Sequence, residues 1–359
     1  MAEHIVVKPE KLAATAVGLL EQELVVPNLF RKEGFDQFRG AKDDTVNLTV
    51  PGLLPFHDYE WRSGSAGSTT PGTRAAIQYD EYSERKIALS FGGNVYSAVK
   101  VTDEQMEMDL AGWSKLLDPQ VRAVGRGLQR RAVKTLVDTP FEVTIGNTVS
   151  NLRGALIEAR RVLNAFQVPD EQRIVLVGSD FEAAMLDDDK LTLAQNVGDA
   201  EAVSALRNAT LGTKLGFTFV TDSTIPSDTA YAILPSGFVF ISGAPRVPNG
   251  APFGATASYE GIALRWLCDY DTDHQEDRSV VNCFAGFDRV KDPLVGYNAA
   301  TGQEFVTSSE YFVRGVKLTL DGASDYPAAA SELATVTGIS DAKVWTPTGA
   351  KAETDPANA

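Results

Sequence analysis

Apolar residues recur at three- and four-residue steps between Asp118 and Asp138, and this pattern predicts a long amphipathic helix. The apolar positions of this stripe are Val121, Val124, Leu128, Ala132 and Leu136. Asp118 can cap free amide groups, and Pro119 fits the first helical position because its missing N–H costs nothing there. At ~1.5 Å per residue the helix would be roughly 30 Å long, which is long enough for a strut through a small domain.

The opposite side of this predicted helix is basic. Arg122, Arg126, Arg130 and Lys134 form what we call the basic ridge, with Arg131 beside it. A solvated face whose charges pair with acids elsewhere in the protein is the simpler interpretation of this pattern. Contact with phosphate groups of a nucleic acid is the other interpretation.

Alternating residues at positions 45–50 predict a half-buried strand, and strand-like sequence resumes over residues 77–91. The intervening sequence is rich in Pro and Gly and contains the run SGSAGSTTPG, so it cannot pack a core of its own. Together the two patterns predict an extended hairpin. His57, Tyr59 and Trp61 lie near its tip, where exposed aromatic residues indicate docking on another molecule. Folding back onto the same chain is the alternative.

Two other segments have a helical pattern. Before Pro27, apolar residues on one face predict a short N-terminal helix that needs a partner surface, and these residues are Leu12, Ala16, Leu19 and Leu20. Residues 152–166 predict a second amphipathic helix. In that helix Glu158 and Arg161 belong to the solvent side of the pattern.

Short apolar runs in the second half of the chain predict strands. The run RIVLV at residues 173–177 is typical of a buried strand that leads into a helix. Residues 231–234 and 238–241 predict a hairpin around a Pro-Ser-Gly turn, and residues 259–270 and 279–284 predict an antiparallel pair. The mixture of helices and strands indicates an α+β fold.

Length and composition limit the possibilities further. A chain of 359 residues is too long for one ordinary core, so two or three lobes are expected. The net charge of −15 argues against nucleic-acid binding over the whole surface, although a local basic face remains possible. No apolar run approaches the ~20 residues of a membrane span, and no signal-peptide pattern opens the chain. We therefore expect a protein that stays in the cytoplasm of the cell that makes it.

Residues suited to catalysis are scarce. The three histidines, His4, His57 and His274, are far apart in the predicted structure, so a nucleophile–histidine pair or a multi-histidine zinc site is poorly supplied. Cys268 and Cys283 lie on the two strands predicted to pair and are interpreted as core thiols. The sequence therefore predicts no cofactor, no metal and no enzymatic activity.

One acidic segment partly matches a calcium loop. Asp269, Asp271 and Asp273 have the spacing of the first three ligands, but His274 replaces the turn glycine and Val280 replaces the bidentate glutamate. A solvated hairpin turn is the stronger interpretation. A metal-dependent hydrolase that uses this turn is the less favoured alternative.

The order of these predicted parts resembles the major capsid proteins of tailed bacteriophages, which have the Hong Kong 97 type fold. Local sequence is also similar to that family and resembles its P-twenty-two coat branch from phages of actinobacteria. The similar segments are TVNLTVP before the hairpin, the Asp118-Pro119 start of an Arg-rich helix, ALRNATLGTKLGFTFV, and GIALRWLCDYD with a later SVVNCFAG. The resemblance covers about residues 8–293.

This resemblance implies a division of the chain into domains. It gives an N-terminal arm at 1–44, an extended hairpin loop at 45–100, a peripheral domain with the spine helix at 101–170 and again at 255–293, and an axial domain at 171–254. Residues 294–359 lie outside the resemblance and are expected to be a C-terminal extension of unknown function.

The resemblance also implies a function. It implies a structural virion protein, not an enzyme, that assembles in the host cytoplasm as homo-pentamers and homo-hexamers. These would close an icosahedral capsid around double-stranded DNA, with scaffolding and portal proteins as further partners and no contact with a membrane. The basic ridge would face the packaged DNA without reading its sequence, and the hairpin tip would contact a neighbouring subunit. An encapsulin nanocompartment of the same fold is the alternative shell.

Overall fold

The computed structural model describes residues 24–33, 45–50, 52–57, 59–60, 64–65, 77, 79–82, 84–90, 93–108, 114–146, 148–188, 212–251, 253–259, 262–298 and 303–343. These residues form two compact units, within the expected range of two or three lobes. Unit 1 takes its described residues from 1–52, 83–139 and 235–290, and unit 2 takes its described residues from 53–82, 140–234 and 291–359. Each unit is therefore discontinuous in sequence.

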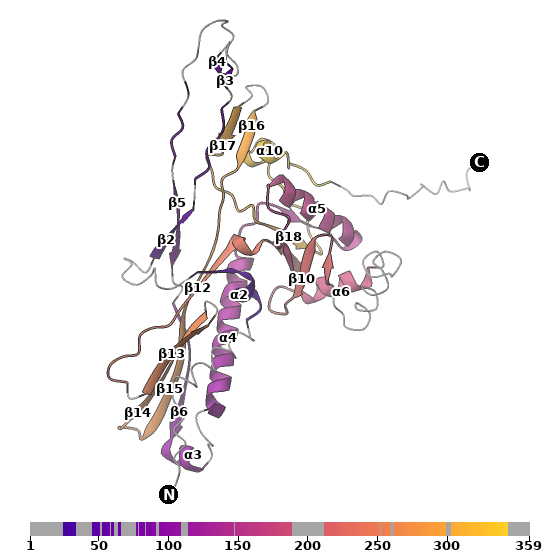
Figure 1. Cartoon of the computed structure of the whole chain (residues 1–359). Coiled ribbons are helices and arrows are strands. Elements are labelled where there is room, and N and C mark those ends of the chain that lie inside the picture. Colours follow the sequence, from indigo (N-terminus) through magenta and orange to yellow (C-terminus); the bar gives the residue numbers. More distant parts are fainter. Residues whose placement is uncertain are drawn as a thin grey trace, which may run out of the picture. The chain divides into compact units, whose positions relative to one another are not determined.

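Unit 1 is built on a six-stranded sheet (Figure 1). The strands along its main path are β1 (Arg31–Glu33), β12 (Phe238–Gly243), β15 (Glu276–Arg289), β14 (Ile262–Asp271) and β13 (Phe253–Tyr259), and β6 (Asn94–Thr102) also pairs with β15. All pairs are antiparallel except β1 with β12. The predicted pairing of residues 259–270 with 279–284 is confirmed by β14 and β15.

The predicted long helix is α4 (Ser114–Val137), which contacts β15 and β6 and follows α3 (Asp103–Met108) in sequence. All five residues of the predicted apolar stripe are fully buried, so that prediction is confirmed. The predicted start at Asp118 was wrong, because the helix begins four residues earlier at Ser114 and contains Pro119 in its second turn. A proline there removes one helical hydrogen bond without preventing the turn before it.

Two features hold α4 close to the sheet. Gln120 exchanges hydrogen bonds with Ser279 of β15, through its amide nitrogen to the Ser279 carbonyl (3.1 Å) and its amide oxygen from the Ser279 hydroxyl (2.9 Å). The indole N–H of Trp266 donates to the same hydroxyl (2.9 Å). Further along the helix, Gly127 faces Val95 so closely that a Cβ would lie 2.7 Å from the valine Cγ1. A buried polar network and a glycine contact together fix the helix on the sheet.

The N-terminal part of the described chain packs on unit 1. The short helix α2 (Val26–Leu29) has Pro27 in its first turn. The backbone amides of Val25 and Val26 donate to Gln129 of α4, and Phe30 stacks on Phe238 with ring centroids 4.8 Å apart. The helix predicted before Pro27 lies outside the described residues.

The predicted extended hairpin is confirmed by the backbone. Strands β2 (Thr45–Val50) and β5 (Arg85–Ser90) pair antiparallel, from Thr45 opposite Ser90 to Val50 opposite Arg85. The second strand is shorter than the predicted 77–91. A two-residue ladder between β3 (Tyr59–Glu60) and β4 (Gly64–Ser65) lies further out along the loop.

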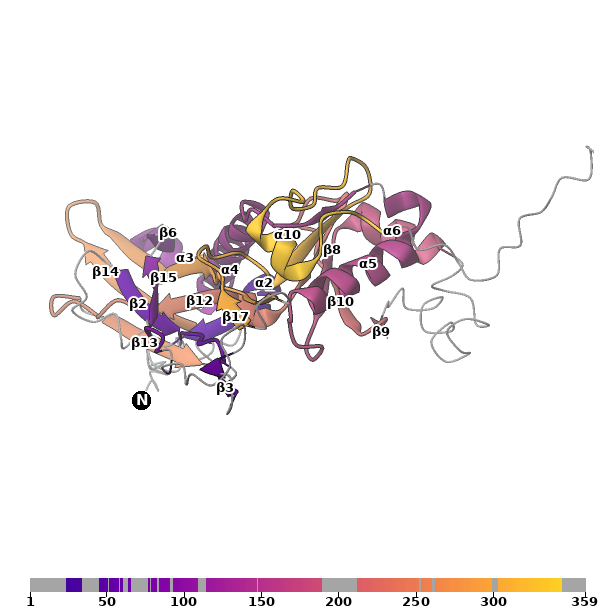
Figure 2. The same ribbon diagram turned by 90° about the horizontal axis from the view of Figure 1, so that it is seen from above.

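Unit 2 contains the second six-stranded sheet and most of the remaining helices. The strand order is β7 (Thr144–Ile145), β18 (Gly315–Thr319), β11 (Thr229–Ile233), β8 (Ile174–Val177), β10 (Phe217–Thr221) and β9 (Thr213–Lys214). Figure 2 shows the helices of this unit, α5 (Leu152–Ala165), α6 (Ser179–Asp187) and α10 (Glu332–Thr337), with β8 and β10. A hairpin of β16 (Val295–Asn298) and β17 (Gln303–Val306) and the 3₁₀ turns η3 (Thr148–Ser150) and η4 (Pro235–Gly237, which belongs to unit 1) complete the described elements.

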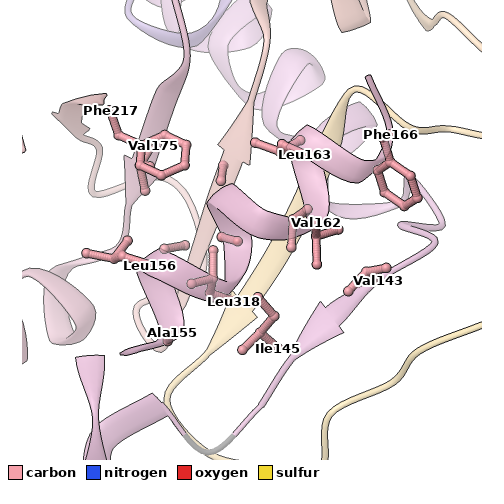
Figure 3. Close-up of a cluster of buried hydrophobic side chains, with 14 of the residues drawn as sticks. Val143, Ile145, Ala155, Leu156, Val162, Leu163, Phe166, Val175, Phe217 and Leu318 are labelled. Atoms are coloured by element: carbon pink, nitrogen blue, oxygen red, sulfur yellow. The ribbon is translucent and has the colours of Figure 1, made fainter. Parts of the chain in front are cut away.

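One hydrophobic core joins α5 and α6 to one face of this sheet (Figure 3). Alternate strand residues point into it, which is the expected period of a strand. The strand residues are Val175, Val177, Ala230, Ala232, Val316 and Leu318, and the helix residues include Leu156, Leu163, Phe181 and Met185. Because both helices contribute to the same cluster, they cover the same face of the sheet. The predicted helix at residues 152–166 is confirmed.

One predicted pairing changes in the structure, and the region predicted as an extension contributes a strand. The hairpin predicted from residues 231–234 and 238–241 was wrong, because β11 and β12 belong to different sheets on either side of η4. Strand β11 pairs with β8 and β18 instead, and β12 pairs with β15. Strand β18, from the region expected to be a C-terminal extension, lies inside the sheet of unit 2 between β7 and β11. The described part of that region is therefore integral to unit 2.

Glu158 was placed on the solvent side of its helix by the sequence pattern, and this was wrong. Its side chain is only 2% exposed. The carboxylate accepts two hydrogen bonds from Arg161 (2.6 and 2.8 Å) and one from the hydroxyl of Tyr326 (3.1 Å). Burial and the neighbouring carboxylate raise the pKa of Tyr326. A buried carboxylate is tolerated here because each oxygen has a donor.

We expect Gly127→Val to lower the free energy of unfolding by about 1–3 kcal/mol, the usual cost of overpacking a core. The added side chain would clash with Val95, a buried and β-branched residue with little freedom to move. Denaturant titration measures the loss. Gly250→Val is the control, because a Cβ at Gly250 has no heavy atom within 4 Å. Equal stability of the two variants would contradict the close packing of α4.

Candidate functional site

The basic ridge of α4 lies on the exposed side of the helix. Arg122, Arg126, Arg130 and Lys134 are all exposed, opposite the fully buried apolar stripe. Four residues of helix rise by ~6 Å, so the four charges follow the helix axis at regular steps. The amphipathic pattern of the sequence thus places these cations on one line in unit 1.

The charges of the ridge differ in their partners. Arg122 pairs with Asp118 on the preceding turn (3.2 Å), as the solvated-face interpretation requires. Arg131 donates to the backbone carbonyls of Gly93 and Asn94 and therefore tethers α4 to the start of β6. Within the described part of the chain no ion pair or hydrogen bond is found for the side chains of Arg126, Arg130 and Lys134. Among the described residues, these three therefore have no partner that would compete with an external anion.

The hairpin loop exposes large apolar side chains. We call Leu53, Leu54, Phe56, Ile77, Tyr79 and Tyr82 the hairpin surface; all are exposed, and Tyr79 reaches 89%. The sequence pattern predicts His57, Tyr59 and Trp61 as the docking residues instead. His57 is largely covered, Tyr59 is described only as part of β3, and Trp61 lies outside the described residues. A search for closely spaced apolar residues beside the Pro- and Gly-rich run would have found the hairpin surface.

Two contacts hold the loop in shape. The Nε2 atom of His57 lies 2.7 Å from a carboxylate oxygen of Asp80, and this contact joins the two sides of the loop. The backbone amide of Phe56 donates to Glu304 of β17 (3.3 Å). The β16–β17 hairpin adds two further exposed aromatic residues, Tyr297 and Phe305. The apolar surface of unit 2 therefore includes residues of the hairpin loop and of the β16–β17 hairpin.

Both cysteines are inert core residues, as predicted. Cys268 and Cys283 are free thiols and both are buried. Burial is the main cause that raises the pKa of each thiol to about 11. A thiol with so high a pKa is a poor nucleophile and a poor metal ligand at neutral pH.

The acidic turn is held by its own chain. Arg278 contacts Asp269 (2.8 Å) and Asp271 (3.5 Å), and His274 contacts Asp271 (3.2 Å). The backbone amide of Asp273 also donates to Asp271, and this bond is the main cause that lowers the pKa of the Asp271 carboxyl. Among the described residues, no group of three or more His, Cys, Asp or Glu side chains is arranged to hold a metal ion. The geometry agrees with a solvated, ion-paired turn.

No helix in the described ranges has both the length and the apolar character needed to span a membrane. The described surfaces present cations on α4 and exposed apolar side chains in the hairpin loop and the β16–β17 hairpin.

Comparison with known proteins gives consistent results. A family profile described as phage capsid protein matches residues 96–283, which is more than half of the chain. No curated protein matches the chain in sequence. The matched segment begins in β6 and ends in β15, so it contains α4 and most strands of the two six-stranded sheets.

Three solved structures with a similar fold are from bacteriophages. A chain of Mycobacterium phage Che8 is 17% identical with a TM-score of 0.57, over 84% of this chain and 92% of that chain. The capsid of cyanophage P-SCSP1u is 10% identical with a TM-score of 0.53, over 89% and 91%. The mature capsid of bacteriophage PhiM1 is 10% identical with a TM-score of 0.51, over 82% and 86%. At these identities the likeness establishes a shared α+β fold.

Thiol chemistry gives a prediction for this part of the structure. At pH 8 the native protein should react with a thiol reagent about 100-fold more slowly than the unfolded protein, because the native thiols ionise about two pH units higher. Absorbance of the released chromophore measures both rates. Rapid native labelling would contradict the burial of Cys268 and Cys283.

The same shift makes stability depend on pH. The native pKa is raised above the unfolded value, so the native state keeps protons that the unfolded state loses. The stabilisation is complete below about pH 9 and declines as the pH rises towards about 11. A variant with both Cys268→Ala and Cys283→Ala should not show the loss of unfolding free energy that the two thiols cause between about pH 9 and about pH 11. Its unfolding free energy should be lower than that of the unaltered protein at every pH.

Proposed function

Because the chain belongs to the phage capsid protein family, we propose that it builds the icosahedral shell of a tailed bacteriophage from pentamers and hexamers of itself. Its role is structural, and we propose no catalytic activity for it. The hairpin surface is the observation that carries this proposal. Six large apolar side chains stay exposed in the loop between β2 and β5, and a protein that acted alone would be expected to cover them.

Repeated weak contacts suit such a shell. Each copy of the chain offers the same surfaces, so a modest free energy per contact is multiplied over a closed symmetric particle. We propose that unit 1, with α4 as its spine, acts as the peripheral domain, and that unit 2 acts as the axial domain. Residues 45–90 would be the extended loop that reaches a neighbouring copy. Scaffolding and portal proteins would be further partners during assembly in the host cytoplasm.

We propose double-stranded DNA as the content of the shell and the basic ridge as one of its contacts. Arg126, Arg130 and Lys134 form a local exception to a net charge of −15. Cations on one line bind backbone phosphates without reading bases, so the contact would have no sequence specificity. This suits a shell that must hold a whole genome.

The first experiment is the mass and shape of the purified protein. Light scattering and negative-stain microscopy should show pentamers, hexamers or closed shells. A protein that stays a compact monomer at high concentration would overturn the shell proposal. Particles that contain a protein cargo and no nucleic acid would favour the encapsulin alternative.

The hairpin surface gives a sharper version of this test. We expect the double variant Ile77→Ser and Tyr79→Ser to reduce assembled protein at least tenfold while the thermal midpoint stays unchanged, because both side chains are exposed. Val149→Ser is the control, since Val149 is also exposed but lies in η3, away from the hairpin sequence. Assembly of the double variant at the level of the control would argue against docking through the hairpin.

The basic ridge gives a separate prediction. We expect the triple variant Arg126→Gln, Arg130→Gln and Lys134→Gln to bind short duplex DNA with a weaker salt dependence. The slope of log affinity against log salt should fall by about 2.7, at ~0.9 per cation removed. Fluorescence anisotropy over a salt series measures the slope.

The control for the ridge removes the same charge elsewhere. Arg153, Arg246 and Lys291 are exposed and lie outside α4, so changing these three to glutamine should leave the slope nearly unaltered. If the ridge variant and this control behave alike, the solvated-face interpretation of the ridge is the correct one.

A further inference from the structure

The outer edge of β13 is a long strand edge in unit 1. In the sheet of that unit β13 stands last in the strand order and pairs only with β14 (Figure 1). The pairing runs without interruption from Phe253 opposite Cys268 to Tyr259 opposite Ile262, so no bulge interrupts the strand. Within the described part of the chain, no strand pairs with its other side. Alternate residues of this seven-residue strand direct their backbone donors and acceptors to this edge, because the others pair with β14.

Proteins usually blunt such edges with short strands, charged residues, prolines or bulges. Three other sheet edges are short, with β1 of three residues and β7 and β9 of two each. The long edge of β6 carries Lys100, which pairs with Glu276 (3.0 Å). Strand β13, with the sequence FGATASY, has neither charge nor proline, and Phe253 at its start is 58% exposed. This edge lacks the protection that the other edges have.

A second unprotected edge lies on the hairpin. The ribbon of β2 and β5 has only two strands, an arrangement that is marginal on its own in water. Strand β5 begins with Arg85 and Lys86, whereas β2, with the sequence TVNLTV, carries no charged residue. Strands β2 and β13 are therefore the two sheet edges of six or more described residues that lack a charged side chain.

We propose that β2 of one copy adds to the outer edge of β13 in a neighbouring copy, so that the six-stranded sheet of unit 1 continues into the hairpin of the next subunit. This inference rests on the proposed shell, because it needs a second copy close by. The backbone supplies the hydrogen bonds, and the uncharged, β-branched sequence of β2 suits a strand with neighbours on both sides. Two different surfaces meet, so the contact is head-to-tail and can repeat around a ring.

A lysine on the edge tests the proposal. Thr256 is exposed at the centre of β13, and a lysine at an edge position opposes pairing. We expect Thr256→Lys to reduce assembled protein at least tenfold with an unchanged thermal midpoint. Thr218→Lys is the matched control, because Thr218 is an exposed threonine on a strand whose two sides are already paired, with β8 and β9. Assembly of Thr256→Lys at the level of this control would overturn the proposal.

Cross-linking between copies gives a second measurement that does not depend on loss of assembly. One preparation carries Thr256→Cys, and a second carries Asn47→Cys or Leu48→Cys, tested separately because neighbouring strand residues point to opposite faces. Paired strands bring Cβ atoms to ~4.5–5.5 Å, close to the range of a disulfide. The two native thiols are buried and give little background. Mixing the preparations under mild oxidation should yield a heterodimer.

The outcomes separate this inference from the shell proposal. If the unaltered protein never assembles, the shell proposal fails and takes this inference with it. If it assembles but no heterodimer forms with either partner cysteine, only the strand addition is wrong. A chain that carries both cysteines and cross-links solely within itself would show pairing inside one copy and would also overturn the inference.

Discussion

The contact between α4 and the sheet of unit 1 is the constraint on which the other surfaces depend. The helix buries its apolar stripe against β15 and β6, and Gly127 allows an approach that any larger residue would prevent. The bonds among Gln120, Ser279 and Trp266 fix its position along the strands. Because the apolar stripe must face the sheet, the rotation of α4 about its axis is fixed. The basic ridge on the opposite side therefore points away from the sheet.

Unit 2 depends on partners that are distant in sequence. Its sheet combines strands from residues 144–145, 174–177, 229–233 and 315–319, and Arg161 and Tyr326 together satisfy the buried Glu158. These contacts make a rigid base for the hairpin loop, through Glu304 and the backbone of Phe56. Rigid cores with exposed apolar projections are what a subunit of a symmetric shell requires.

Periodicity predicted the elements that bury one face against one neighbouring layer. Helices α4 and α5 and strand β14 followed from their apolar spacing, and the hairpin followed from two strand patterns around a Pro- and Gly-rich run. Glu158 was misplaced because Tyr326, one of its donors, is 168 residues away and no local pattern records it. Strands β11 and β12 were wrongly predicted to pair. Two apolar runs joined by a short turn can form a hairpin, but they can equally belong to two different sheets, as they do here. The hairpin surface was not predicted, because the docking prediction rested on His57, Tyr59 and Trp61 near the tip of the loop.

The discontinuous units have a consequence for synthesis on the ribosome. Strand β2 emerges early, but the sheet that contains β13 needs β15, which ends at Arg289, and the sheet of unit 2 needs β18, which ends at Thr319. A nascent chain therefore has the proposed donor strand long before it has the finished sheet that is the proposed acceptor. A chain broken before residue 315 lacks an inner strand of unit 2 and cannot complete its fold. The order of the strands thus separates complete from incomplete subunits, since only a polypeptide that extends past Thr319 contains every strand of both six-stranded sheets.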